Sequence, residues 1–63
     1  MKSLTGQKEI ISHTKRSWRL IYRWIKEDDF PAKKLGGRWE SIAELIDEWK
    51  AKRINSPTNG QVN

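Results

Sequence analysis

The sequence has no cysteine and only one histidine, His13. Without cysteine the chain can form neither a disulfide nor a thiolate metal site, and one histidine does not complete a structural zinc site. No run of residues is apolar enough for a transmembrane helix or a signal peptide, so we expect no membrane association and a cytoplasmic location. We also expect no cofactor.

Apolar residues are scarce, since hydrophobic side chains make up 35% of the 63 positions. A chain of this length forms one domain at most, close to the lower size limit for folding alone. Four tryptophans compensate for the shortage, because each aromatic side chain buries about 150–250 Å². We therefore expect one small core that is rich in tryptophan.

Positive charge is unevenly distributed along the chain. Thirteen Lys and Arg against eight Asp and Glu give a net charge of +5. Residues 1–26 carry +6, residues 27–48 carry −4, and the remaining segment carries +3. Segregated positive charge favours a polyanionic partner on one face of the molecule. A basic surface that only keeps the protein soluble is the alternative.

The segment around residues 17–26 predicts an amphipathic helix. Ser17 is a typical N-cap residue, whose hydroxyl accepts a hydrogen bond from an amide of the first turn. In a helix over about Trp18–Lys26, one face is apolar and the opposite face is cationic and free of acids. The apolar face comprises Leu20, Ile21, Trp24 and Ile25. The cationic face comprises Arg19, Tyr22, Arg23 and Lys26.

A shorter helix is expected before it, over about Gly6–Ser12, with Thr5 as the N-cap. The polar stretch His13–Arg16 then forms the turn between the two helices. After the second helix, Phe30 and Pro31 prevent continuation, because proline lacks an amide donor and biases the preceding residue towards an extended conformation.

Two short strands, Ala32–Leu35 and Arg38–Glu40, flank a pair of glycines and predict a β-hairpin. A two-residue loop would place Leu35 and Trp39 on opposite faces of the hairpin. A three-residue loop ending at Arg38 would pair Leu35 with Trp39 and point both inward. We favour the three-residue loop, which leaves Arg38 at the tip.

A third helix is predicted from Ser41 onward, because Ser41 and Glu44 have the spacing of a capping box. Apolar residues follow at intervals of three and four and would form a core stripe. The stripe comprises Ile42, Leu45, Ile46 and Trp49. The last segment, residues 54–63, has no periodicity and almost no apolar content, so we expect a disordered tail.

The elements follow one another in the order helix, turn, helix, β-hairpin, helix. The predicted fold class is therefore mainly α with a small β-hairpin, arranged as a compact winged helix-turn-helix. The chain divides into a lead-in of residues 1–4, a winged helix-turn-helix domain of residues 5–53, and the tail.

Four segments form a pattern that resembles a known family. They are residues 17–25, 30–31, 33–39 and 46–49, with the sequences SWRLIYRWI, FP, KKLGGRW and IDEW. The pattern is similar to that of small excisionase-like and AlpA-like proteins, the minimal winged-helix relatives of the MerR DNA-binding domain. It is also similar to the N-terminal domain of lambda-like terminase small subunits. The resemblance covers about residues 4–53. It implies a helix in the major groove of DNA and a hairpin on the minor groove or the backbone.

The candidate DNA-binding residues fall into three groups. The cationic helix face would read base edges, since arginine makes bidentate contacts to guanine. The turn before it would bind a phosphate at the helix N-terminus, and the hairpin would approach the backbone near its glycines. The helix group is Trp18, Arg19, Tyr22, Arg23 and Lys26, the turn group is Lys15, Arg16 and Ser17, and the hairpin group is Lys33, Lys34 and Arg38.

Each group also has a purely structural interpretation. The helix cations could form an ordinary solvated face, and charges on an edge strand could serve only to prevent aggregation. Trp18 could pack on the first helix instead of flanking DNA. The other tryptophans, Trp24, Trp39 and Trp49, are expected in the core, and His13 is expected to be a plain turn residue.

We expect a double-stranded DNA-binding protein that acts as a recombination directionality factor or a small prophage regulator in a bacterial host cell. It would be a monomer or weak dimer that binds DNA cooperatively, with an integrase or a terminase as candidate protein partner. One alternative is the DNA-recognition module of a packaging terminase small subunit. Another is a protein-binding adaptor that presents Glu44, Asp47 and Glu48 to a basic partner. We do not expect an enzyme, because the acidic run at residues 27–29 lacks an accompanying base, nucleophile or concave site.

Overall fold

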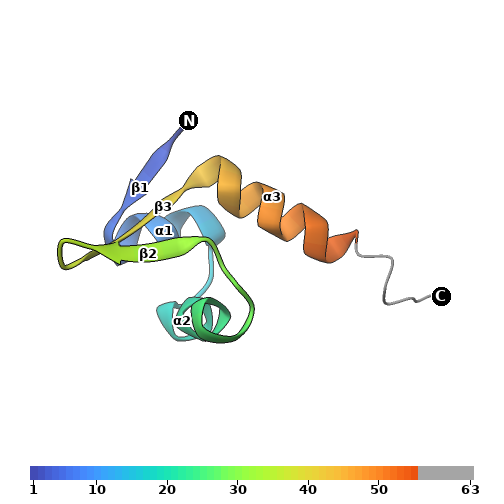
Figure 1. Ribbon diagram of the computed structural model, residues 1–63, viewed down its shortest axis with the longest axis horizontal. Helices are drawn as coiled ribbons and strands as arrows, with labels where there is room; N and C mark the ends of the chain where they lie inside the picture. Colours follow the sequence, from blue (N-terminus) through green and yellow to red (C-terminus); the bar gives the residue numbers. More distant parts are fainter. Residues whose placement is uncertain (56–63) are drawn as a thin grey trace.

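The described part of the chain forms three helices and one three-stranded antiparallel sheet in the computed structural model (Figure 1). The structure describes residues 1–55. The elements are β1 (Ser3–Thr5), α1 (Gly6–Thr14), α2 (Trp18–Glu27), β2 (Ala32–Leu35), β3 (Arg38–Ile42) and α3 (Ala43–Ile54). The predicted order of helix, turn, helix, hairpin, helix is confirmed, with one additional strand. Within the described range, no helix has the length and apolar character needed to cross a membrane.

The additional strand, β1, lies in the segment that we predicted to be a lead-in. It pairs antiparallel with β3, with Leu4 opposite Ser41, so the sheet order is β1-β3-β2. Leu4 is buried in the core. The lead-in prediction was therefore wrong. A strand of three residues is too short for a periodic signal, and its pairing partner lies far away in the sequence.

The hairpin has a two-residue loop, so the three-residue loop that we favoured is wrong. Leu35 pairs with Arg38, and the two glycines between them have φ angles of 59° and 85°. Positive φ at both central positions is typical of a type I′ turn, whose twist matches that of the flanking strands. As a consequence Leu35 is 60% exposed, whereas Trp39 packs against the core.

The starts of α1 and α2 were predicted correctly, with one difference in capping. The Ser17 hydroxyl accepts a hydrogen bond from the Leu20 amide at 3.3 Å, as expected for an N-cap. Thr5 occupies the N-cap position of α1, but its side chain makes no capping hydrogen bond. Its amide instead donates to the Glu9 carboxylate at 2.9 Å. The helix α1 continues through His13 to Thr14, so the turn is shorter than predicted.

The predicted capping box of the third helix is wrong. Ser41 is buried in β3, where its hydroxyl donates to the Pro31 carbonyl. The helix α3 is capped by Lys2, whose carbonyl accepts from the Ala43 amide at 2.8 Å and whose amide donates to the Glu44 carboxylate at 2.9 Å. This hydrogen bond lowers the pKa of Glu44. The N-terminal segment therefore takes over the role that we assigned to Ser41.

The core lies between the sheet and the three helices. The predicted stripe of α3 is correct in part, since Ile46 is buried and Leu45 is 40% exposed. Three of the four tryptophans were expected in the core, and all four pack against it while remaining partly accessible. The buried core residues are Leu4, Ile10, Ile21, Phe30, Ala32, Ala43 and Ile46.

The predicted tail begins one residue too early, because Ile54 is the last residue of α3. The expectation of disorder for residues 56–63 concerns residues outside the described range.

Candidate nucleic-acid interface

One face of α2 carries all the cationic residues that we predicted to read DNA. Arg19, Arg23 and Lys26 are exposed, and Tyr22 is 42% exposed. The opposite face packs into the core through Ile21, which is fully buried. The segregation of the two faces, predicted from the sequence, is therefore confirmed.

The cationic face is not free of acids, which corrects one part of the prediction. Because α2 extends to Glu27, the Glu27 carboxylate lies 3.5 Å from the Arg23 guanidinium, one helical turn away. Both side chains are mostly exposed, and such pairs contribute at most about 1 kcal/mol. An incoming phosphate or base can compete for Arg23 at little cost. Arg19 makes no ion pair within the described residues.

Aromatic contacts attach this face to the hairpin. The Trp18 ring lies 5.6 Å from the Trp39 ring of β3, and the Tyr22 ring meets Trp39 edge-on at 6.2 Å. On its other side, Tyr22 lies beneath the Lys26 ammonium at 5.6 Å. The aromatic partner of Trp18 is thus on β3, a position that we did not predict. These contacts fix the orientation of α2 relative to the hairpin.

The three hairpin cations do not share one surface. Residues that pair across strands project to the same side of a sheet. Lys34 pairs with Trp39 and so lies on the side that faces α2, whereas Lys33 pairs with Glu40 on the other side. Arg38 pairs with Leu35, on the side of Lys33, but its guanidinium lies beside Gly6 at the start of α1, where Arg38 lines a hollow together with Lys34. The structure therefore brings Lys34 and Arg38 together in this hollow, whereas Lys33 lines a different hollow with Lys34 and Lys26.

The turn before α2 holds its first cation in a strained conformation. Lys15 is the C-cap of α1, with φ of 59° and ψ of 37°, and its amide donates to the Ile11 carbonyl at 2.7 Å. A left-handed conformation costs a residue with a side chain about 1–2 kcal/mol, and glycine is the usual choice at this position. A lysine here is explained if its charge is needed at the N-terminus of α2.

Replacing Lys15 with glycine is therefore expected to change stability and DNA binding in opposite directions. The relieved strain should raise the free energy of unfolding by about 1 kcal/mol. If the turn binds a DNA phosphate, as predicted from the sequence, loss of the charge should weaken DNA binding and reduce the slope of log K against log salt by about 1. Urea unfolding and fluorescence anisotropy measure the two effects. The control Lys15→Ala removes the charge but keeps the strain, so it should lose affinity without gaining stability. Unchanged DNA affinity in both variants would contradict a phosphate contact.

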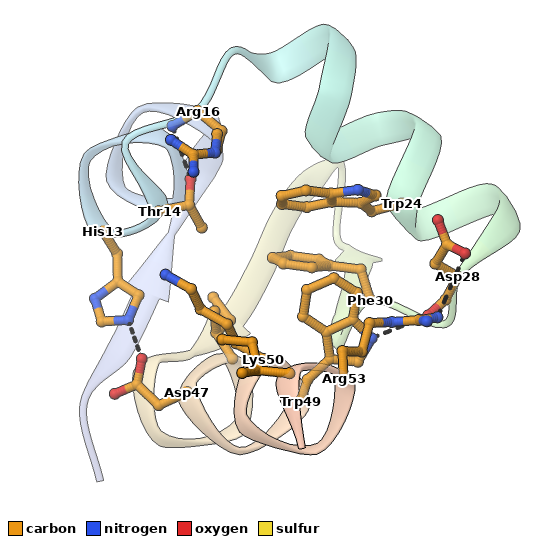
Figure 2. Close-up of a pocket in the computed structure, with 12 residues that line it drawn as sticks. His13, Thr14, Arg16, Trp24, Asp28, Phe30, Asp47, Trp49, Lys50 and Arg53 are labelled. Carbon is orange, nitrogen blue, oxygen red and sulfur yellow. Dashed lines mark hydrogen bonds and ion pairs between the residues drawn. The ribbon is translucent and has the colours of Figure 1, made fainter. Parts of the chain in front are cut away.

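Arg16, the second cation of the turn, donates from its guanidinium to the Lys15 carbonyl at 3.4 Å. Its side chain lies beside Thr14 and faces α3 across a hollow (Figure 2). The hollow contains three aromatic residues, and its rim includes a hydrogen bond of 2.9 Å between the His13 and Asp47 side chains. Neither the hollow nor this pair was predicted, because each joins residues distant in sequence. The only feature of the sequence that could have indicated this hollow is the number of tryptophans, which exceeds what so small a core can bury.

Residues 1–55 contain no group of three or more His, Cys, Asp or Glu side chains that could hold a metal ion. Comparison of the chain with protein-family models, with curated protein sequences and with solved structures gives no match. Any functional assignment must therefore rest on the geometry of the chain itself.

Proposed function

We propose that this protein binds double-stranded DNA as a compact winged helix-turn-helix protein. In this proposal α2 enters the major groove and the β2–β3 hairpin contacts the backbone or the minor groove. The observation that carries the proposal is the exposed face of Arg19, Tyr22 and Arg23, held next to the hairpin by Trp39. The ten residues of α2 correspond to a rod of about 15 Å, and the major groove, about 12 Å wide, admits an α-helix.

The two kinds of contact divide between the elements. Arg19 and Arg23 lie one helical turn apart, which suits arginines that bind guanine edges in neighbouring base pairs. Lys15 precedes α2 and Lys34 lies on the hairpin, and both would bind phosphates, which supply most of the affinity. A module of this size reads few base pairs, so we expect cooperative binding to paired sites.

Within this class, the role we favour is that of an excisionase-like recombination directionality factor or a small prophage transcription regulator. The DNA-recognition module of a packaging terminase small subunit has the same surface requirements. The genes adjacent to this one distinguish the two roles, since an integrase gene supports the first and a terminase large-subunit gene supports the second.

The adaptor alternative has less support, because its three carboxylates already have partners. Glu44 accepts a hydrogen bond from the Lys2 amide at 2.9 Å, and Asp47 lies 2.9 Å from His13. Glu48 lies 3.6 Å from Lys52 on the same helix. The exposed Glu48–Lys52 pair could be displaced as easily as the Arg23–Glu27 pair, but a basic partner would also have to displace the Lys2 amide and His13, whereas Arg19 of α2 has no ion-pair partner among residues 1–55.

Two adjacent lysines provide the test of the proposed surface. Lys34→Ala should weaken binding to all duplexes and reduce the slope of log K against log salt by about 1, because Lys34 lies on the α2 side of the hairpin. Lys33→Ala removes the same charge from the opposite side and should have a smaller effect. Fluorescence anisotropy with a labelled duplex, titrated from 50 to 300 mM salt, measures both. Equal effects would indicate attraction to net charge without the proposed surface.

A further inference from the structure

A second site lies on a different part of the molecule, between the C-terminal ends of α1 and α2 and one side of α3 (Figure 2). This cleft has a volume of about 400 Å³. Its apolar part is formed by Trp24, Phe30 and Trp49, whose rings lie 5.1 to 5.9 Å apart. Trp24 and Trp49 remain partly accessible. Accessible aromatic rings in a concave site bind apolar side chains strongly.

The two carboxylates in the cleft wall are already engaged. Asp28 lies 3.4 Å from the Arg53 guanidinium, and its carbonyl accepts hydrogen bonds from Trp49 at 2.9 Å and from Arg53 at 2.8 Å. Asp47 lies 2.9 Å from His13. These contacts also hold α3 against the rest of the molecule, so the cleft keeps its shape without a ligand.

The cations of the cleft wall have fewer partners. Arg16 and Lys50 line the cleft from opposite sides, and neither takes part in an ion pair within the described residues. Arg53 lies over the Trp49 ring at 5.1 Å but is paired with Asp28, so the unpaired positive charge of the rim comes from Arg16 and Lys50. The cleft therefore combines an aromatic centre with an unneutralised cationic rim.

The polar groups indicate the kind of ligand. Sites for small molecules usually hold a few buried polar groups that orient the ligand. Within residues 1–55, no buried side-chain nitrogen or oxygen lacks a hydrogen-bond partner, and Arg16 and Lys50 are exposed. An apolar centre with an exposed polar rim is the arrangement of a protein–protein interface.

We propose that this cleft binds an acidic peptide segment of a partner protein. An aromatic or aliphatic side chain of the segment packs against the accessible parts of the Trp24 and Trp49 rings, which contact each other at the base of the cleft, and flanking carboxylates bind Arg16 and Lys50. The cationic residues of α2 that we assign to DNA, Arg19 among them, do not line this cleft. Arg16, which we predicted to bind a DNA phosphate, is reassigned to this cleft, and the cleft shares no other residue with the proposed DNA surface.

The test uses the full chain labelled with ¹⁵N and two synthetic hexapeptides. The first carries glutamates around a central phenylalanine and leucine, and the second replaces every glutamate with glutamine. The acidic peptide should shift the indole N–H signals of Trp24 and Trp49 and leave that of Trp39 unchanged. The glutamine peptide should bind at least tenfold more weakly.

Two charge reversals on α3 provide the matched control. Lys50→Glu should weaken binding of the acidic peptide about tenfold, because Lys50 lines the cleft. Lys52→Glu changes the net charge equally on the same helix, outside the cleft, and should weaken binding less than twofold. Equal losses in the two variants, or no shift of the Trp24 and Trp49 signals by the acidic peptide, would overturn the proposal. Equally tight binding of indole-3-acetate would overturn the peptide assignment in favour of a small-molecule site.

Discussion

Replacing Arg19 or Arg23 with alanine is expected to weaken binding to the preferred DNA site by about 1–3 kcal/mol each, or roughly 5- to 150-fold. Both guanidinium groups lie on the exposed face of α2 and are available to a base edge. A bidentate contact to guanine is lost completely on truncation, since alanine cannot replace either hydrogen bond. The preferred site is obtained first, by selection of the unmodified protein on a random duplex library.

The same variants should lose little affinity for random duplexes, because phosphate contacts supply most nonspecific binding. Lys8→Ala is the matched control, since Lys8 is exposed on α1 and its loss changes the net charge equally. Glu27→Gln tests the remaining acid of the face. It frees Arg23 from its 3.5 Å ion pair and should leave binding equal or tighter. If Arg19→Ala weakened random and selected duplexes by the same factor, α2 would not be the element that reads sequence.

The parts of the fold that sequence predicts correctly are those with local causes. The Ser17 cap and the two faces of α2 depend on residues within three helical turns of one another. The end of α2 before Phe30 follows from the proline beside it. The exposure of Arg19 could therefore be predicted without knowledge of the rest of the chain.

The parts that sequence misses depend on contacts between distant residues. The strand β1 exists because Leu4 pairs beside Ser41, and that pairing places Lys2 where it caps α3. Ser41 and Glu44 have the spacing of a capping box, yet burial of Ser41 in β3 removes its hydroxyl from the helix start. Local propensity thus gives way to tertiary structure at this junction.

The candidate site likewise has features with local causes, which the sequence predicts, and features that depend on distant contacts, which it does not. Charge and spacing identify the cations of α2, but only the hairpin register separates Lys34 from Lys33. A loop longer by one residue would exchange the sides to which the two lysines project. The cleft beside Trp49 is likewise invisible in the sequence, because three helices contribute to it.

Replacing Ile21 with alanine is expected to destabilise the protein by about 2–5 kcal/mol. Ile21 is fully buried, and the neighbouring side chains cannot close the cavity that its loss creates. A single core in a domain of this size supplies only about 3–5 kcal/mol of net stability. The variant should therefore be largely unfolded at 37 °C and should lose DNA binding with its structure, whereas Arg19→Ala should leave the melting temperature unchanged.

Leu35→Ala is the matched control, because it also truncates an aliphatic side chain to a methyl group. Leu35 is 60% exposed at the end of β2, so its loss should change the free energy of unfolding by less than about 0.5 kcal/mol. Thermal unfolding followed by circular dichroism compares the two variants directly. A large loss at Leu35 would mean that this side chain points inward, as a three-residue hairpin loop requires. Lys34 would then project away from α2, and the proposed DNA surface would lose its hairpin contact.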